Sequence, residues 1–143
     1  MKRRLALIAA FSAVLGLSAC GGGSDDSSSS AQVYDAPALV RNDTVVGTGA
    51  EALASSTVTV NYTLWLYDTT KAQSKGARMD GPATLTRRLG DLIPGWQQGV
   101  PGMKVGGKRT LIVPSSLGYG TRGSGAIPPN AGLVFDIELT AVN

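Results

Sequence analysis

Residues 92–114 read LIPGWQQGVPGMKVGGKRTLIVP, and this stretch decides the fold. It places Trp96, one of two tryptophans in the chain, between a Pro-Gly turn signal and Gly99. Gly99 and Pro101 limit a helix here to one or two turns, over residues 93–99. Because so short a helix is not stable alone, we expect it to lie across a sheet with Trp96, its bulkiest side chain, pointing inward.

Strand patterns lie on both sides of this helix. Apolar and polar residues alternate strictly over 57–66, and the C-terminal run 133–141 repeats the pattern, so both are predicted to be half-buried strands. A third strand is expected over 109–113, with weaker candidates at 44–46 and 83–89. Several antiparallel strands and one short helix predict an α+β domain.

The first twenty residues have the organisation of an export signal. Lys2, Arg3 and Arg4 precede an apolar run, residues 5–17, that is shorter than the roughly 20 residues a helix needs to span a bilayer. Leu17-Ser18-Ala19-Cys20, which begins at the last residue of this run, resembles the lipobox of bacterial lipoproteins, which implies cleavage before Cys20 and acylation of Cys20. A secretory signal with a chance cysteine is the alternative. Cys20 is the only cysteine, so neither a disulfide nor thiol catalysis remains for the rest of the chain.

We therefore expect three segments: a lipoprotein signal peptide, 1–19, an acylated Cys20 with a flexible Gly/Ser/Asp tether, 20–32, and a folded domain, 33–143. Acyl chains would hold the domain on a membrane surface in the cell envelope. Gly21, by resemblance to Gram-negative lipoproteins, favours the outer membrane and the periplasm. Cleavage would remove three of the 13 basic residues and leave ten against ten acidic ones, which gives no electrostatic basis for binding nucleic acid.

The composition excludes several kinds of catalysis. The chain has no histidine, which excludes Ser-His-Asp and Cys-His arrangements and the common zinc sites. The glycines at 118–125 open no helix, as a phosphate loop requires. We expect neither a cofactor nor a metal. One reaction fits these restrictions, which is rotation about an X-Pro peptide bond between cis and trans. It needs neither a cofactor nor a metal, because it crosses a barrier of about 18–20 kcal/mol without making or breaking a bond.

Four stretches carry a resemblance to a known family: VNYTLWLYD (60–68), residues 92–114, LGYGTRG (117–123) and AIPPNAGLVFDIEL (126–139). They closely resemble the FKBP-type peptidyl-prolyl cis-trans isomerases, immunophilins that bind macrolides. The resemblance implies a twisted antiparallel sheet of five to six strands wrapped around one short α-helix. It also implies an apolar pocket that accelerates X-Pro rotation in polypeptides by stabilising the twisted amide without covalent chemistry, and that macrolides inhibit.

The resemblance further implies which residues form the pocket. Trp96 would be the floor on which the proline ring rests, and the Tyr119 hydroxyl would meet a ligand carbonyl. The implied catalytic residues are Tyr62, Asp80, Trp96, Tyr119 and Phe135. The implied substrate-binding residues are Met79, Leu92, Ile93 and Ile127, with Ile93 also offering its backbone N–H to a substrate carbonyl.

The sequence departs from the family after the first long hairpin, where a Phe-Asp pair is usual. Without a gap that pair falls on Ala72 and Gln73, whereas a longer hairpin places it on Met79 and Asp80, which we prefer. A flexible Met can replace an aromatic wall. The alternative is that Asp80 is only a turn residue before a Gly-Pro pair.

This alignment shortens the segment from Asp80 to Trp96, so the usual strand bulge would be largely deleted, and Ala83 or Leu85 would replace a second aromatic residue. We therefore expect a wider, less aromatic pocket. The preferred function is an isomerase acting on X-Pro bonds of envelope proteins. The alternatives are a catalytically weak binding or chaperone lipoprotein of the same fold, and a purely structural envelope anchor.

Overall fold

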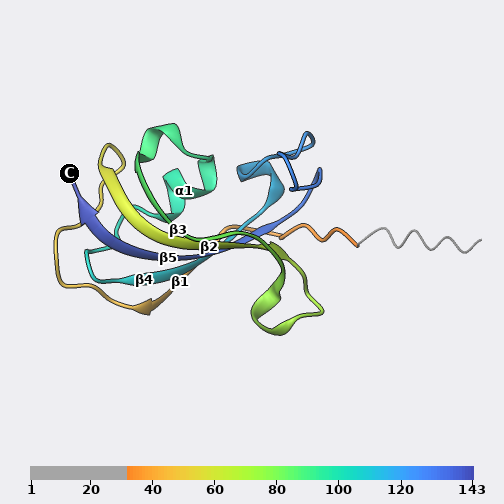
Figure 1. Cartoon of the computed structure of the whole chain (residues 1–143), viewed down its shortest axis with the longest axis horizontal. Coiled ribbons are helices and arrows are strands. Elements are labelled where there is room, and N and C mark those ends of the chain that lie inside the picture. The colour runs from red at the N-terminus through yellow and green to blue at the C-terminus, as the bar shows by residue number, and fades with distance from the viewer. Residues whose placement is uncertain (1–31) are drawn as a thin grey trace, which may run out of the picture. The chain divides into compact units, whose positions relative to one another are not determined.

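Five antiparallel strands form one twisted sheet in the computed structural model, which describes residues 32–143 (Figure 1). The strands follow the spatial order β1-β4-β5-β2-β3, so β1 and β3 are the edges. Their bounds are Val40–Val45 (β1), Thr57–Tyr67 (β2), Lys75–Arg88 (β3), Lys108–Val113 (β4) and Leu133–Val142 (β5). The helix α1, Pro94–Gly99, lies over one face of the sheet. The expected α+β architecture is confirmed.

Three short 3-10 turns complete the secondary structure of the described residues: η1 (Ala72–Ser74), η2 (Leu89–Asp91) and η3 (Ser115–Leu117). Val33–Asn143 form one compact unit. The predicted signal peptide 1–19, Cys20 and almost all of the predicted tether 20–32 lie outside the described residues. From residue 32 onward, no helix has both the length and the apolar character needed to cross a membrane.

The core lies between α1 and the sheet, where the alternation of β2 and β5 directs apolar side chains. Val58, Val60 and Leu64 of β2 are at most 4% exposed, as are Phe135 and Ile137 of β5. Removing apolar surface from water contributes about 25 cal/mol per Å², so this shared face dominates the stability of the fold. The strands expected at 57–66 and 133–141 match β2 and β5 to within one residue.

Two glycines let α1 lie directly on β4. A Cβ atom added at Gly95 would fall 2.4 Å from Cγ1 of Val113, and one added at Gly99 would fall 2.8 Å from Cδ1 of Leu111. Trp96, between them, is 3% exposed. The short helix therefore lies across the sheet with Trp96 inward, as expected.

A buried arginine ties the end of α1 to two strands. Arg109 of β4 is 8% exposed and donates to the Gly99 carbonyl at 2.6 Å. Its Nε and Nη2 atoms donate to the Asp43 carboxylate of β1 at 2.5 and 3.1 Å. Since a buried charge is tolerated only when it is paired and hydrogen-bonded, this network satisfies Arg109 and holds α1 against β1 and β4.

β3 begins much earlier than the strand expected at 83–89. Residues 83–88 pair with 57–62 of β2 without a register shift. The first shift follows the Tyr62–Ala83 pair, because the next pair joins Leu64 to Asp80 and leaves Gly81 and Pro82 unpaired in the register. The bulge is thus absent between Ala83 and Arg88. Glycine and proline are typical strand breakers in sequence, but an edge strand tolerates proline, which has no N–H, because one side of that strand needs no ladder partner.

Candidate active site

A cavity of about 90 Å³ lies between the sheet and α1. Its lining comes from β2, β3, the start of α1, the loop after η3 and β5. The lining residues are Tyr62, Leu64, Asp80, Leu85, Leu92, Ile93, Trp96, Tyr119 and Phe135. One carboxylate and two hydroxyl groups therefore stand among otherwise apolar side chains.

Three aromatic rings meet edge to face at this cavity. The Tyr62 and Trp96 ring centroids are 5.7 Å apart with the planes at 85°, and the Trp96 and Phe135 centroids are 5.2 Å apart at 88°. Such arrangements are worth about 0.5–1.5 kcal/mol per pair beyond area burial. Nε1 of Trp96 is buried without a hydrogen-bond partner among the described residues. The indole is therefore held by ring packing.

Asp80 and Tyr62 form a hydrogen-bonded pair across β3 and β2. The Tyr62 hydroxyl donates to Oδ2 of Asp80 at 2.5 Å. Burial, and after it the hydrogen bond to the Asp80 carboxylate, raises the pKa of Tyr62 to about 12. Tyr62 is therefore a fixed neutral donor at physiological pH, and Asp80 is more than a turn residue.

Gly81 sets the position of Asp80. Its N–H donates to Oδ1 of Asp80 at 2.8 Å, and its φ of +82° is a conformation that other residues rarely adopt. A Cβ atom at Gly81 would also fall 2.4 Å from the Tyr62 carbonyl oxygen. A glycine is required here, and it brings the Asp80 carboxylate to the Tyr62 hydroxyl.

Two further polar groups belong to residues that line the cavity. Tyr119, in the loop 115–132, is 36% exposed, so its side chain reaches both the lining and solvent. The Ile93 carbonyl accepts from Trp96 and Gln97, while its own N–H makes no hydrogen bond among the described residues. The Tyr119 hydroxyl and the Ile93 N–H are therefore hydrogen-bond donors beside the apolar floor of the cavity.

The structure brings together most, but not all, of the residues that the sequence pointed to. The cavity lining contains Tyr62, Asp80, Leu92, Ile93, Trp96, Tyr119 and Phe135. Met79 is not among the lining residues and packs, partly buried, against the core. Ile127 is also absent from the lining, since it is 9% exposed within the core cluster. Leu85, rather than Ala83, faces the cavity, and Leu64 joins it without having been singled out.

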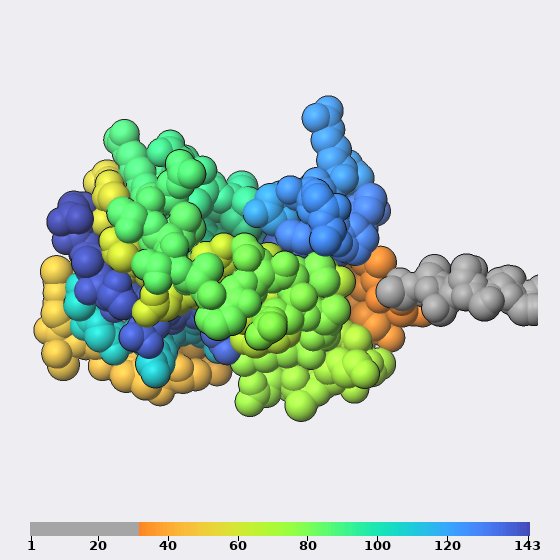
Figure 2. Space-filling view, viewed as in Figure 1, coloured from red at the N-terminus to blue at the C-terminus, as the bar shows by residue number. Residues whose placement is uncertain are grey.

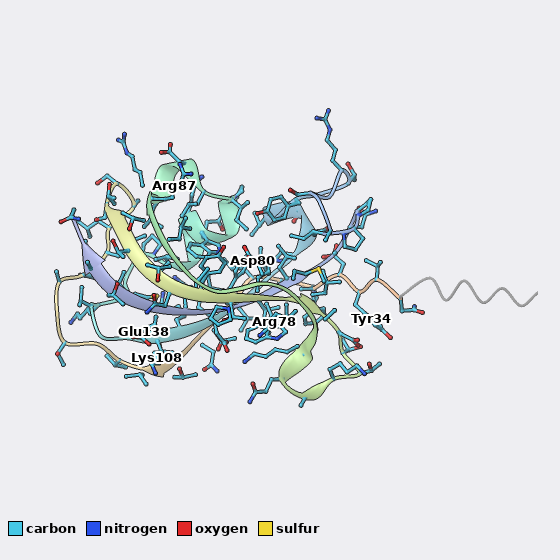
Figure 3. The ribbon with its side chains drawn as sticks, in the orientation of Figure 1. Tyr34, Arg78, Asp80, Arg87, Lys108 and Glu138 are labelled. Carbon is cyan, nitrogen blue, oxygen red and sulfur yellow. The ribbon has the colours of Figure 1, made fainter. Side chains whose placement is uncertain are left out.

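A larger hollow, of about 780 Å³, lies on the opposite face of the sheet. Many of its lining side chains are polar or charged, and most of the charged ones are paired within the protein. Lys75 lies 2.6 Å from Asp136. Lys108 lies 3.6 Å from Glu138, and Figure 3 shows this pair on the face away from α1. Among residues 32–143, Tyr62 is the one aromatic residue in the lining of this hollow, whereas four aromatic residues line the smaller cavity, so the smaller cavity is the candidate site.

The cavity offers binding and orientation rather than covalent chemistry. Within residues 32–143, no three His, Cys, Asp or Glu side chains gather closely enough to hold a metal ion. The groups present are an apolar floor and walls, one hydroxyl locked to a carboxylate, a second hydroxyl at the rim and a free backbone N–H. They suit a small ring with carbonyl groups beside it.

Comparisons with known proteins agree with this geometry. Residues 49–140 match the family model described as FKBP-type peptidyl-prolyl cis-trans isomerase. An FK506-binding protein of Neisseria meningitidis serogroup A is 47% identical over 105 residues, which cover 73% of this chain and 95% of that protein. The crystal structure of FkpA from Escherichia coli superposes with a TM-score of 0.65 at 39% identity, covering 73% of this chain and 48% of FkpA. A peptidyl-prolyl cis-trans isomerase from Pseudomonas syringae gives 0.65 at 33% identity, covering 76% and 78%.

Proposed function

This chain belongs to the FKBP-type peptidyl-prolyl cis-trans isomerases, and from that membership we propose how its cavity acts on an X-Pro bond and where in the cell it works. The chain is a peptidyl-prolyl cis-trans isomerase. The assignment of roles to the cavity residues, the nature of its substrates and its location are our proposals.

The cavity holds the proline ring on Trp96, between the edges formed by Tyr62 and Phe135. A volume of about 90 Å³ suits one small ring and excludes a whole peptide segment. The apolar lining replaces water around the imide bond. A planar amide is stabilised by resonance, and the twisted amide loses it, so a dry site that fits the twisted form better than the planar one lowers the barrier.

The polar groups orient the two carbonyls beside the ring. The Tyr119 hydroxyl, at the rim, donates to one substrate carbonyl, and the Ile93 N–H donates to the other. We assign the hydrogen-bonded Tyr62 and Asp80 side chains to the carbonyl that precedes proline, as the groups it meets when it rotates. Since these groups are already in place, little reorganisation accompanies the twist.

The edge-to-face packing of Trp96 beneath an accessible cavity is the observation that carries this assignment. The test is isomerisation of a proline-containing tetrapeptide by wild type and by Trp96→Leu. Trp65→Leu is the matched control, because Trp65 lies under the Lys75 ammonium at 4.5 Å and does not line the cavity. Loss of acceleration in Trp96→Leu alone supports the proposal, and equal activity in both variants contradicts it.

A binding or chaperone role with little turnover is the second candidate, and Leu85 in the cavity wall is the feature that favours it. A leucine packs less rigidly on a proline ring than an aromatic side chain does. Tight peptide binding without acceleration over the spontaneous rate would establish this role in place of efficient catalysis.

We also propose that macrolides compete with peptides for this cavity. The support is that several similar proteins are named FK506-binding proteins, including the one from Neisseria meningitidis. FK506 should inhibit the tetrapeptide reaction competitively. If it raised neither the apparent KM nor the melting temperature, the cavity would not be a macrolide site.

Finally, we propose that the protein is a lipoprotein of the cell envelope that acts on exported polypeptides. The basic head, the apolar run 5–17 and Leu-Ser-Ala-Cys ending at Cys20 support this location. Labelled palmitate should enter the wild-type protein in bacterial cells and not Cys20→Ser. Release of unlabelled wild-type protein into the soluble periplasmic fraction would contradict it.

A further inference from the structure

The segment 34–36 touches both ends of the loop 115–132, which carries Tyr119. The Asp35 carboxylate accepts from the Ser115 N–H at 2.7 Å and from the Ser115 hydroxyl at 2.6 Å. The Tyr34 carbonyl accepts from the Gly132 N–H at 2.8 Å. Figure 2 shows the orange atoms of this segment directly against the blue atoms of the loop. We propose that Asp35 is a positioning residue for the isomerase reaction, which holds Tyr119 at the cavity through Ser115.

Ser115 connects Asp35 to the backbone around Tyr119. Ser115 is 7% exposed, and its carbonyl accepts from the N–H groups of Gly118 and Gly120, at 3.0 and 2.9 Å. These two glycines are the neighbours of Tyr119 in the chain. The backbone on both sides of the rim tyrosine is therefore tied to the one residue that Asp35 holds.

Asp35 is itself fixed from both sides. Tyr34 is bonded to Gly132, and Ala36 is 5% exposed. A Cβ atom added at Gly132 would fall 2.6 Å from the Ala36 nitrogen, so the two backbones lie in direct contact. The carboxylate thus approaches Ser115 from a rigid support, which favours two hydrogen bonds at once.

Among the described residues, few hydrogen bonds join the loop to the rest of the protein, although Ile127 and Ala131 are buried in the core cluster. Within residues 32–143, Asp35 is the only side chain outside the loop that hydrogen-bonds to residues 115–131. The other hydrogen bonds there run between backbone groups of the loop, as from Gly123 to Tyr119 and from Asn130 to Gly120, or to the adjoining Pro114. Loss of the Asp35 carboxylate would therefore loosen Ser115 and the two bonds that its carbonyl accepts from Gly118 and Gly120, while leaving the later turns of the loop in place.

The inference rests on the proposed role of Tyr119 and is tested with the tetrapeptide assay on the purified protein. Asp35→Ala should lower kcat/KM by no more than the loss of about twofold to tenfold expected for Tyr119→Phe, because Asp35 acts through the Tyr119 hydroxyl. Asp35→Asn keeps a hydrogen-bond acceptor, so its kcat/KM should lie between those of the wild type and of Asp35→Ala. Asp68→Ala is the matched control, since the Asp68 carboxylate bonds only within its own turn, to Thr70.

A double-mutant cycle separates positioning from a merely structural role. On a Tyr119→Phe background, Asp35→Ala should have little further effect on kcat/KM, because the group that Asp35 positions is already missing. Amide exchange at Gly118 and Gly120 should be faster in Asp35→Ala and unchanged in Asp68→Ala. Should Asp35→Ala prove poorly folded, Asp35→Asn is carried through the same cycle.

Each contrary result decides the matter. A wild-type kcat/KM in both Asp35 variants overturns the inference, and so does an equal loss with and without the Tyr119 hydroxyl. A loss that only follows the unfolded fraction, measured by circular dichroism, also overturns it. A wild-type protein that fails to accelerate isomerisation contradicts the proposed function itself, whereas an active wild type with indifferent Asp35 variants contradicts this inference alone.

Discussion

The Phe135 ring stands at 88° to the Trp96 indole, with their centroids 5.2 Å apart. Phe135 comes from the central strand β5 and Trp96 from α1, so this contact joins the wall of the cavity to its floor. Its strength sets how rigidly the floor is held under a proline ring.

Phe135→Leu should therefore lower kcat/KM by about threefold to tenfold. The change removes one edge-to-face contact, worth about 0.5–1.5 kcal/mol, while leaving an apolar side chain in place. The only other phenylalanine, Phe11, lies in the predicted signal peptide, so Phe135 is the one phenylalanine of the folded unit. Unchanged kinetics in a folded variant would mean that the wall does not touch the substrate.

Tyr119→Phe should reduce the rate about twofold to tenfold, because it removes one hydrogen bond worth about 0.5–1.5 kcal/mol net. The ring stays, so the melting temperature should hardly change. Kinetics and thermal unfolding of the same sample check this. A variant that unfolded would place Tyr119 in the core instead of at the rim.

The Tyr62 phenol should make the fold sensitive to alkaline pH. Its pKa is raised from 10.0 to about 12 by burial and then by the hydrogen bond to Asp80. The protonated form is therefore favoured in the folded state. Its contribution is complete below pH 10, and it is lost as pH rises towards 12. Urea unfolding across this range should show a decline that Tyr62→Phe reduces, and an identical decline in both proteins would contradict the assignment.

Asp43 should make the fold sensitive to acid. The hydrogen bond from Arg109, opposed in part by burial, lowers the pKa of Asp43 below 3.8. The carboxylate form is favoured in the folded state, so its contribution is present above pH 3.8 and is lost as pH falls through the lower folded value. Asp43→Asn should be less stable at neutral pH and should lose less stability on acidification, with Asp91→Asn as an exposed control. Parallel acid unfolding curves for wild type and Asp43→Asn would refute this.

The sequence predicted the elements whose signals are local. Strict alternation marked β2 and β5, and Gly99 with Pro101 marked the end of α1. Resemblance pointed to the residues that line the cavity, such as Trp96 and Phe135, because long stretches near them match a family.

What it could not predict depends on contacts between distant residues. Asp35 and Ser115 are 80 residues apart, and Asp43 and Arg109 are 66 apart, so no local pattern joins them. Met79 was expected in the pocket wall, but the side of β3 on which it falls depends on register shifts that single-residue preferences do not encode.

The glycines of α1 have a consequence for engineering this cavity. Gly95 and Gly99 lie directly on the side chains of Val113 and Leu111. These two aliphatic side chains do not line the cavity, yet they set the distance between the Trp96 indole and the sheet. Smaller or larger side chains at these two positions would move α1, and Trp96 with it, towards or away from the sheet. The depth available to a proline analogue could then be adjusted without altering any surface that the analogue touches.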